Sequence, residues 1–270
     1  MNAPEKILSN PLPDVQSNLD TRNLPIQRVG IKGFRHPVLV ATAIGPQPSV
    51  ATIEMGVGLP HHVKGTHMSR FIEVFQNHDK PLEMASLHSL MRAMLDRLEA
   101  SDGFIAIELP YFIRKSAPVS GVSSLMDYQA KWQAQRQDGK DRLSLQVVVP
   151  VTSLCPCSKN ISDYGAHNQR SHVTITVESQ QAVTPEQLIR IAESAASCEL
   201  WGLLKRPDEK YVTERAYDNP KFVEDLVRDM ALMLAANPQF TGFTVESENF
   251  ESIHNHSAYA RIDHGSRLQS

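Results

Sequence analysis

The segment His172–Ala192, HVTITVESQQAVTPEQLIRIA, contains the two periodicities from which the fold is predicted. In Val173–Val177 the apolar residues alternate with threonines, as in a β-strand with one buried face. Thr184 and Gln187 then form a capping box, with proline at the first helical position between them. This pattern predicts a helix that runs to about Ala196.

Strands and helices occur in a similar order on both sides of this segment. The other predicted strands are Val38–Ala43, Val50–Leu59, Phe104–Leu109, Leu125–Gln133, Leu143–Val151, Phe240–Glu246 and Ser257–Ile262. Apolar stripes at helical spacing predict the helices His67–Asn77 and Ala85–Glu99, and another helix starting at Asn219 and Pro220. Each half of the chain thus consists of strands, two helices and strands.

This doubled pattern predicts an α+β fold with helices on one face of antiparallel sheets. We divide the chain into a flexible N-terminal arm at residues 1–25, a first module at 26–150 and a second module at 151–270. Such sheets have open edges, and pairing between subunits into a barrel would cover them. We therefore expect a homo-oligomer.

Composition excludes several classes of protein. The net charge is −3, which gives no sign of a nucleic-acid-binding surface, and 41% of the residues are apolar, enough for a packed core. No apolar run is long enough for a membrane span, and the N-terminus lacks the apolar stretch of a secretory signal. We expect a cytoplasmic protein with no nucleic-acid or membrane partner. Three cysteines do not form a disulfide framework.

The segment Ser153–Ser171 is predicted to be an irregular loop and carries the strongest chemical signal. Cys155 and Cys157 flank a proline, and Lys159 and His167 follow closely. A lone cysteine is usually buried and inert, but this segment is too polar for a core. One thiol could bind a metal while the other reaches a substrate; paired Cys-x-x-Cys units for a structural zinc site are lacking.

Three further segments have weaker signals. The charge run Leu204–Glu214 is typical of a solvated loop. Val245–His256 combines acids with His254 and His256, and His-x-His on a strand would suit a metal or an acid/base pair. Lys64–Phe71 places cations at a helix start, where they are disfavoured unless an anion binds. Cys198 is predicted to lie late in a helix, as a core residue or a neighbour of the site.

Six blocks together resemble the signature blocks of the prokaryotic type IB GTP cyclohydrolase I family. They are KGTHMSRF (Lys64–Phe71), SAPVSG (Ser116–Gly121), LCPCSK (Leu154–Lys159), YGAHNQRSH (Tyr164–His172), LLKRPDEKYVTE (Leu203–Glu214) and ESENFESIHNH (Glu246–His256). The resemblance covers the chain from about Arg22 to Ile262.

The resemblance implies the tunnelling fold, with two ββααββ modules per subunit and sheets that close into barrels in an oligomer, expected to be a tetramer. It implies GTP as substrate and a divalent metal, zinc or manganese, as cofactor. The products would be formate and 7,8-dihydroneopterin triphosphate, which feeds folate and, in many bacteria, 7-deazaguanine tRNA nucleoside biosynthesis.

The resemblance also implies roles for individual residues. The metal ligands would be Cys155, His167 and Glu209. Cys157 would be the second, substrate-facing thiol, and His254 and His256 would transfer protons. Glu251 would accept hydrogen bonds from guanine, with Glu224 as the second candidate, and Lys64, His67 and Arg70 would bind the triphosphate. Which of the two neighbouring thiols binds the metal stays open.

Two alternatives remain at this point. Another tunnelling-fold enzyme acting on a pterin or deazapurine, such as a nitrile reductase, would need a nicotinamide site and a single nucleophilic cysteine. A non-catalytic metal- or nucleotide-binding module would need no second thiol and no acid/base pair.

Overall fold

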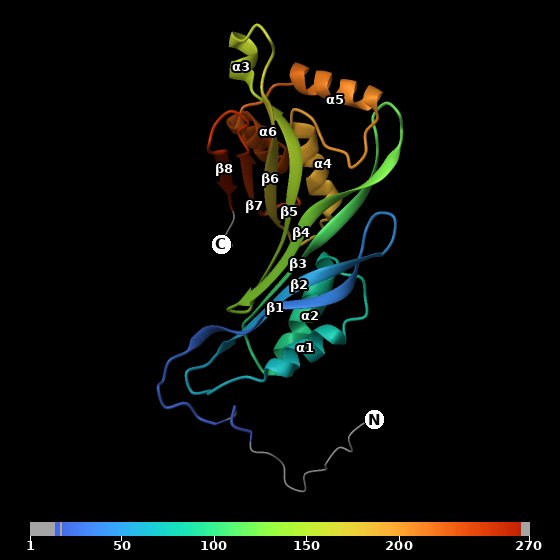
Figure 1. Ribbon diagram of the computed structural model, residues 1–270. Coiled ribbons are helices and arrows are strands. Elements are labelled where there is room, and N and C mark those ends of the chain that lie inside the picture. Colours follow the sequence, from blue (N-terminus) through green and yellow to red (C-terminus); the bar gives the residue numbers. More distant parts are fainter. Residues whose placement is uncertain (1–13, 17, 266–270) are drawn as a thin grey trace.

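The computed structural model describes residues 14–16 and 18–265 of the chain. Its strands form one antiparallel sheet in which every strand pairs with the next strand in sequence (Figure 1). The eight strands are β1 (Ile26–Val40), β2 (Gln47–Leu59), β3 (Gly103–Ser116), β4 (Ser123–Gln137), β5 (Lys140–Leu154), β6 (Asn168–Glu178), β7 (Gly242–Asn249) and β8 (Ala258–His264). The helices of the described residues are α1 (Met68–Gln76), α2 (Met84–Leu98), α3 (Pro156–Ile161), α4 (Pro185–Ala195), α5 (Arg206–Asp218) and α6 (Val223–Ala235).

The doubled pattern expected from the sequence is present. β1, β2, α1, α2, β3 and β4 form one ββααββ unit, and β5, β6, α4, α6, β7 and β8 form a second, into which α3 and α5 are inserted. The two units meet at a two-residue turn, where Asp138 and Gly139 both have positive φ, as a tight hairpin turn requires. The division that we placed between residues 150 and 151 falls inside β5. Residues 1–13 and 17 of the predicted arm lie outside the described residues.

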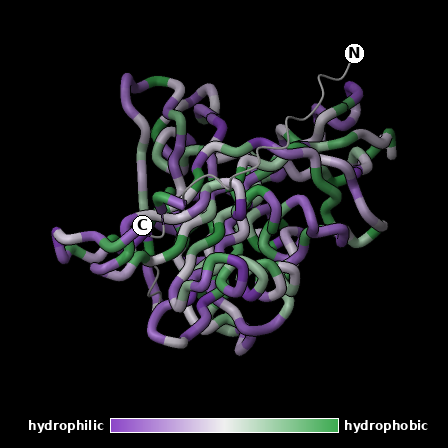
Figure 2. The backbone as a smooth tube through the Cα atoms, turned by 90° about the horizontal axis from the view of Figure 1, so that it is seen from below, coloured by the Kyte–Doolittle hydropathy of each residue, from purple (hydrophilic) through white to green (hydrophobic). Residues whose placement is uncertain are grey.

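The alternation of apolar and polar residues along the strands gives the sheet one buried face. In β5, for example, Leu143, Leu145, Val147, Val149 and Val151 are all buried. Helices α1, α2, α4 and α6 cover this face, and a single apolar core runs through both units. Apolar segments run through the central part of the molecule in Figure 2. Burying one such side chain stabilises the fold by about 1.5–3 kcal/mol.

Helix α4 begins as predicted and also joins the two units. The side chain of Gln187 accepts a hydrogen bond from the backbone N–H of Thr184 at 2.9 Å, which confirms the capping box. Further along the helix, Glu193 accepts hydrogen bonds from the Tyr128 hydroxyl at 2.8 Å and from Lys115 Nζ at 2.7 Å. Both partners belong to strands of the first unit.

Three local predictions are wrong. Within the run predicted as a loop, residues 206–214 form most of helix α5, and the predicted loop Ser153–Ser171 contains α3 and the start of β6. Cys198 is buried as expected, but α4 ends before it. It lies in a short bridge opposite Thr152, next to the end of β5.

Within the described chain, the two edges of the sheet and one of its faces are not covered by other elements. β1 and β8 are edge strands, and the sheet face opposite the helices has no layer over it. None of the described helices is both long and apolar enough to span a membrane. Both the open edges and the bare face are consistent with the expected association of subunits.

Candidate active site at the β5–β6 connection

Cys155 is held between the end of β5 and the start of α3. It is the N-cap residue of α3, with extended backbone, and its Sγ accepts a hydrogen bond from the Ser158 N–H at 3.5 Å. Pro156 occupies the first helical position, where a missing N–H costs nothing. Cys155 is half-buried, while Cys157, in the first turn of α3, is exposed. The proline therefore turns the chain into a helix between the two thiols.

His167 lies directly beside Cys155. The Cys155 N–H donates to the His167 carbonyl at 3.2 Å, and the His167 N–H donates to Ser158 Oγ at 3.2 Å. The imidazole Nδ1 is 2.8 Å from Gln169 Oε1. Since an amide oxygen can only accept, this contact favours the tautomer with the proton on Nδ1, in which Nε2 is the nitrogen able to bind a metal.

The loop between β7 and β8 folds back over His167. A Glu251 carboxylate oxygen is 4.0 Å from His167 Nδ1, and Gln169 Nε2 donates to the other oxygen at 3.5 Å. The side chains of His167 and Glu251 are only 14% and 13% exposed. Gln169 thus links the imidazole to the carboxylate and fixes the orientation of both.

His254 and His256 lie in this same loop, between the two last strands as the sequence predicted. Their rings stack, with centroids 5.2 Å apart and planes 20° apart. Both are exposed. They are therefore close to each other and accessible to a substrate or a proton donor.

Glu209 and Glu224 lie on the two helices that pack beside this connection. Glu209 is exposed in the first turn of α5, one helical turn before Val212. Val212 packs in a small apolar cluster with Leu154 and Ala166, the neighbours of Cys155 and His167. Glu224 is exposed in the first turn of α6. The Lys221 N–H just before α6 donates to the Leu154 carbonyl at 3.1 Å.

The structure brings two of the three predicted metal ligands together. Cys155 and His167 are neighbours, but within residues 14–16 and 18–265 no three His, Cys, Asp or Glu side chains are close enough to hold a metal ion. Thiolate and imidazole with a carboxylate suit zinc, and three protein ligands leave a position open for chemistry. The donor types therefore fit the implied metal, while Glu209, the third predicted ligand, is not part of such a group in the described part of this structure.

The residues predicted to bind phosphate lie elsewhere. His67 is the N-cap of α1 and contacts Asp14 at 3.3 Å, Arg70 follows in the first turn, and Lys64 is exposed. The predicted helix start is confirmed. In Figure 1, however, α1 is at the lower end of the molecule, and α3 and α5 are at the upper end. The two groups of predicted residues are thus far apart within one chain.

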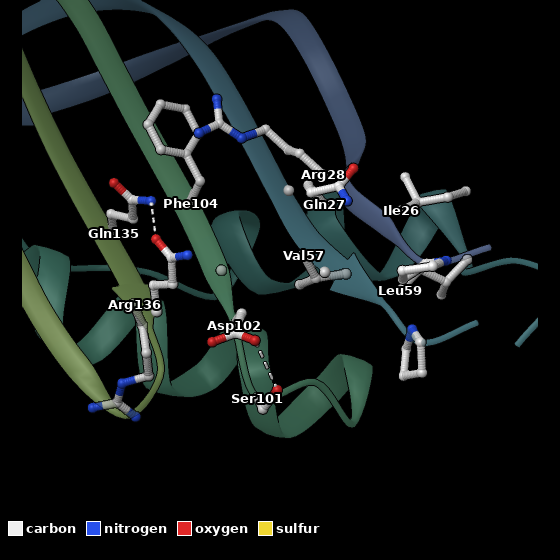
Figure 3. A pocket seen from close by; sticks show the side chains of 16 residues that line it. Ile26, Gln27, Arg28, Val57, Leu59, Ser101, Asp102, Phe104, Gln135 and Arg136 are labelled. Atoms are coloured by element: carbon white, nitrogen blue, oxygen red, sulfur yellow. Dashed lines mark hydrogen bonds between the residues drawn. The ribbon is translucent and has the colours of Figure 1, made fainter. Parts of the chain in front are cut away.

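A large cavity also lies at the lower end of the molecule. It has a volume of about 530 Å³ and is formed where β1 to β4 come together, with Arg28 stacked 3.7 Å over the ring of Phe104 (Figure 3). Asp102, Gln135 and Arg136 also line it. It contains no predicted metal or catalytic residue. A substrate site shared between subunits would not be closed within one chain.

The sequence profile described as "Type I GTP cyclohydrolase folE2" matches residues 12–260. The chain belongs to this family. Similar members include the GTP cyclohydrolase FolE2 of Cupriavidus pinatubonensis, 58% identical over 258 residues that cover 96% of each chain. The GTP cyclohydrolase FolE2 of Paraburkholderia phymatum is 59% identical over 259 residues, covering 96% of this chain and 97% of that protein.

A solved structure similar in fold is the uricase from Arthrobacter globiformis. It has a TM-score of 0.52 and 7% sequence identity, and the match covers 90% of this chain and 96% of that chain. At this identity the likeness concerns the fold alone, and it supports the tunnelling fold for the single chain. FolE2 membership confirms the prediction of a GTP cyclohydrolase and disfavours the nitrile reductase and the binding module.

Sequence reasoning missed three residues that organise this FolE2 site. Gln169 and Ser158 fix His167, and the buried Asp208 caps α5. Gln169 pairs with Ser153 across the β5–β6 ladder, so its place depends on strand register. For Asp208 a signal was available, because Lys-Arg-Pro-Asp has proline in the first helical turn with an acid following, which is typical of a helix start.

Proposed function

We propose that this FolE2 protein hydrolyses GTP to formate and 7,8-dihydroneopterin triphosphate in folate biosynthesis. The observation that carries the proposal is its near-full-length identity, close to 60%, to proteins named GTP cyclohydrolase FolE2. We further place it in the prokaryotic type IB group and in the cytoplasm. 7-deazaguanine tRNA nucleoside biosynthesis is a second proposed user of the product.

We propose Cys155, His167 and Glu209 as the ligands of a divalent metal, zinc or manganese. The half-buried Cys155 and His167 are joined by a backbone hydrogen bond, and the exposed Glu209 lies on the helix packed against the same corner. When bound, such a metal supplies Lewis acidity for the attack of water on C8 of guanine. Cys155 is the better metal ligand of the two thiols because only Cys155 adjoins His167.

The other roles follow from exposure and position. Cys157 is accessible for contact with the opening ring, and the paired imidazoles of His254 and His256 can take up and return protons near neutral pH. Lys64, His67 and Arg70 supply cations and a helix N-terminus for a triphosphate.

Removing the metal tests the proposed mechanism directly. Purified protein treated with a chelator should convert no GTP, and zinc or manganese should restore formate release and, after oxidation, pterin fluorescence. Without the metal, water is too weak a nucleophile at neutral pH. Full turnover by protein shown to be metal-free would contradict the proposal.

The choice between Glu251 and Glu224 for binding guanine has its own test. Glu251 lies beside His167, a proposed ligand of the metal that acts at C8 of guanine. The N1–H and 2-amino edge lies at the opposite end of guanine from C8. A carboxylate so close to a metal ligand is poorly placed for the far edge, so the geometry favours Glu224. We expect E224Q to lower kcat/KM about tenfold to a hundredfold at unchanged metal content, because charge-assisted hydrogen bonds are lost.

The matched variant is E251Q, which should weaken metal binding, since it alters a carboxylate that contacts the imidazole ligand. Metal content and kcat/KM for GTP, measured on both variants, decide the assignment. A selective loss of GTP affinity in E251Q, with full metal content, would return the guanine-binding role to Glu251.

A further inference from the structure

Asp208 is a buried carboxylate in the first turn of α5, next to the exposed Glu209. Its side chain is inaccessible to solvent, yet no cation within residues 14–16 and 18–265 pairs with it. One carboxylate oxygen accepts from the N–H groups of Val119 and Ser120, both at 2.8 Å. The other accepts from Ser120 Oγ at 2.6 Å and from the Lys205 N–H at 2.8 Å. These four donors satisfy the lone pairs of the carboxylate.

The contact joins parts of the chain that are 88 to 89 residues apart. Val119 and Ser120 belong to the SAPVSG block, which forms the tip of the β3–β4 hairpin and to which the proposed chemistry assigns no role. Gly121 in this tip has φ +68, a conformation that favours glycine, and the Ala117 N–H donates to the Val122 carbonyl at 2.9 Å. The tip is therefore shaped to present its N–H groups to one acceptor.

Helix α5 has few other contacts at this end. Its buried residues are Asp208, near the start, and Ala216, in the last turn. An ion pair between Arg215 and Glu199 at 2.8 Å also lies near the end of the helix. Hydrophobic packing thus fixes the C-terminal part of α5, and the Asp208 carboxylate fixes the N-terminal part.

A short chain of bonds links Asp208 to its neighbour. The Lys205 N–H is held by the Asp208 carboxylate, and the Lys205 carbonyl accepts from the Glu209 N–H at 3.0 Å. The Glu209 carboxylate itself forms no hydrogen bond or ion pair with any other part of the described chain. Its direction therefore depends on the backbone of this first turn.

We propose that Asp208 is a positioning residue that, with the β3–β4 hairpin tip, holds Glu209 for metal binding. The inference rests on the proposed role of Glu209 as a ligand and adds the group that orients it. It also gives the SAPVSG block a function, which is to supply donors that fix the first turn of α5.

Co²⁺ serves as the probe, because its visible absorption reports the ligands and its affinity can be titrated without turnover. In the full-length protein, E209Q should lower Co²⁺ affinity at least tenfold. D208N keeps the shape of the side chain but presents an NH₂ group to the Lys205 N–H, so it should lower affinity about tenfold, within the range for residues that orient metal ligands. In D208N/E209Q the loss should equal that of E209Q alone, because Asp208 acts through Glu209.

The outcomes separate the two proposals. If E209Q binds Co²⁺ as the unaltered protein does, Glu209 is not a ligand, and the positioning role fails with it. If E209Q loses affinity and D208N does not, only the positioning role is wrong. If both lose affinity but the losses add in the double variant, Asp208 acts by general stabilisation and the inference is also overturned.

Two further variants guard against misfolding. S120A removes the 2.6 Å bond to Asp208, together with a longer 3.4 Å bond that Ser120 Oγ accepts from the Val122 N–H in the hairpin tip. It should lower Co²⁺ affinity roughly two- to fivefold, again without effect in the E209Q background. If D208N does not fold, unchanged affinity in S120A overturns the inference. S86A removes the equivalent capping contact of α2, where Ser86 Oγ accepts from the Glu83 N–H at 3.2 Å. It should leave Co²⁺ affinity unchanged.

Discussion

Cys155 and Cys157 differ in their surroundings although only one residue separates them. Cys155 directly follows strand β5, is half-buried and adjoins His167. Cys157 is exposed in the first turn of α3. Because a metal ligand needs neighbouring donors and a substrate-facing thiol needs access, the two positions suit two different roles.

We therefore expect C155A to lose bound metal and C157A to retain it while losing ring opening. Metal content by atomic emission and formate release from GTP, measured on both variants, check this. C198A is the control for loss of a thiol elsewhere and should keep its metal. A metal-free C157A with a metal-loaded C155A would exchange the two roles.

Cys198 illustrates why a cysteine near a site need not belong to it. It is fully buried, and burial followed by the nearby charge of Glu199 raises the pKa of its thiol to about 11. At neutral pH the thiol is therefore protonated, and a protonated thiol is neither a nucleophile nor a metal ligand. Its contribution is apolar packing against Leu154 and Ala216.

A sequence points to reactive side chains more readily than to the residues that orient them. Cys155 and His167 stand out because thiols and imidazoles are rare in polar loops. Gln169 does not, because an amide becomes important only through its place opposite Ser153 in the ladder. Such second contacts depend on strand register, which one sequence does not reveal.

At the scale of elements, helix α4 holds the two units together through two glutamates. Glu186 accepts from the Tyr111 hydroxyl and Glu193 from the Tyr128 hydroxyl, from the same side of the helix. Burial, followed by these carboxylates, raises the pKa of both tyrosines well above the usual value. Burial alone would raise the pKa of Glu186, but its hydrogen bonds outweigh burial, and the net shift is downward.

Y128F should lower the free energy of unfolding by about 1 kcal/mol at pH 8, because the half-buried Glu193 carboxylate loses one of its two donors while Lys115 remains. At higher pH the difference should shrink. An unfolded tyrosine ionises near pH 10 while folded Tyr128 keeps its proton, so the unaltered protein loses stability as pH rises above about 10.

Urea unfolding at pH 8 and at about pH 10.5 measures both effects. Y164F is the matched control, since the Tyr164 side chain is fully exposed. Equal stabilities of Y128F and the unaltered protein at pH 8 would show that the hydrogen bond to Glu193 contributes nothing to the joint between the units.

Helix α5 was missed for a physical reason. The run from Lys205 to Glu214 is almost entirely polar, and a polar segment with no apolar stripe resembles a solvated loop. Its helix is stabilised by a proline start, the contacts of Asp208 and an i,i+4 ion pair between Lys210 and Glu214 at 2.8 Å. The strands and amphipathic helices were predicted because an element with one buried face needs apolar residues at regular spacing. Helix α5 buries too few residues to show such a spacing.

At the scale of the molecule, the predicted site is divided between two ends. β5 comprises fifteen residues, so its ends are roughly 45 Å apart at 3.3 Å per residue. Cys155 follows its last residue. Lys64, His67 and Arg70 lie beyond β2, whose end is linked through β3 and β4 to the start of β5. This separation is far longer than a GTP molecule, so one chain cannot contribute both groups to one substrate.

If these assignments hold, each site combines the metal group of one subunit with the phosphate group of another. Mixing two inactive variants, K64A and C155A, by coexpression should then restore activity to about a quarter of the unaltered level, because one site in four receives both intact groups. GTP turnover of the co-purified mixture, compared with each variant alone, gives the result. If mixed oligomers show no gain over the single variants, the shared site is wrong. Either one subunit supplies both groups of a site, or only one of the two groups belongs to the site.

The sheet also has a consequence for how the chain acquires its structure. Each strand pairs with the strand that precedes it, so spatial order repeats the order of synthesis. A nascent chain can therefore add strands one at a time to an existing edge, with β3 and β7 joining after the helices that precede them. Contacts between segments close in sequence have a low entropic cost and form quickly. The first unit, including its α1–α2 pair, can therefore form before the strands and helices around the metal group are added to its edge.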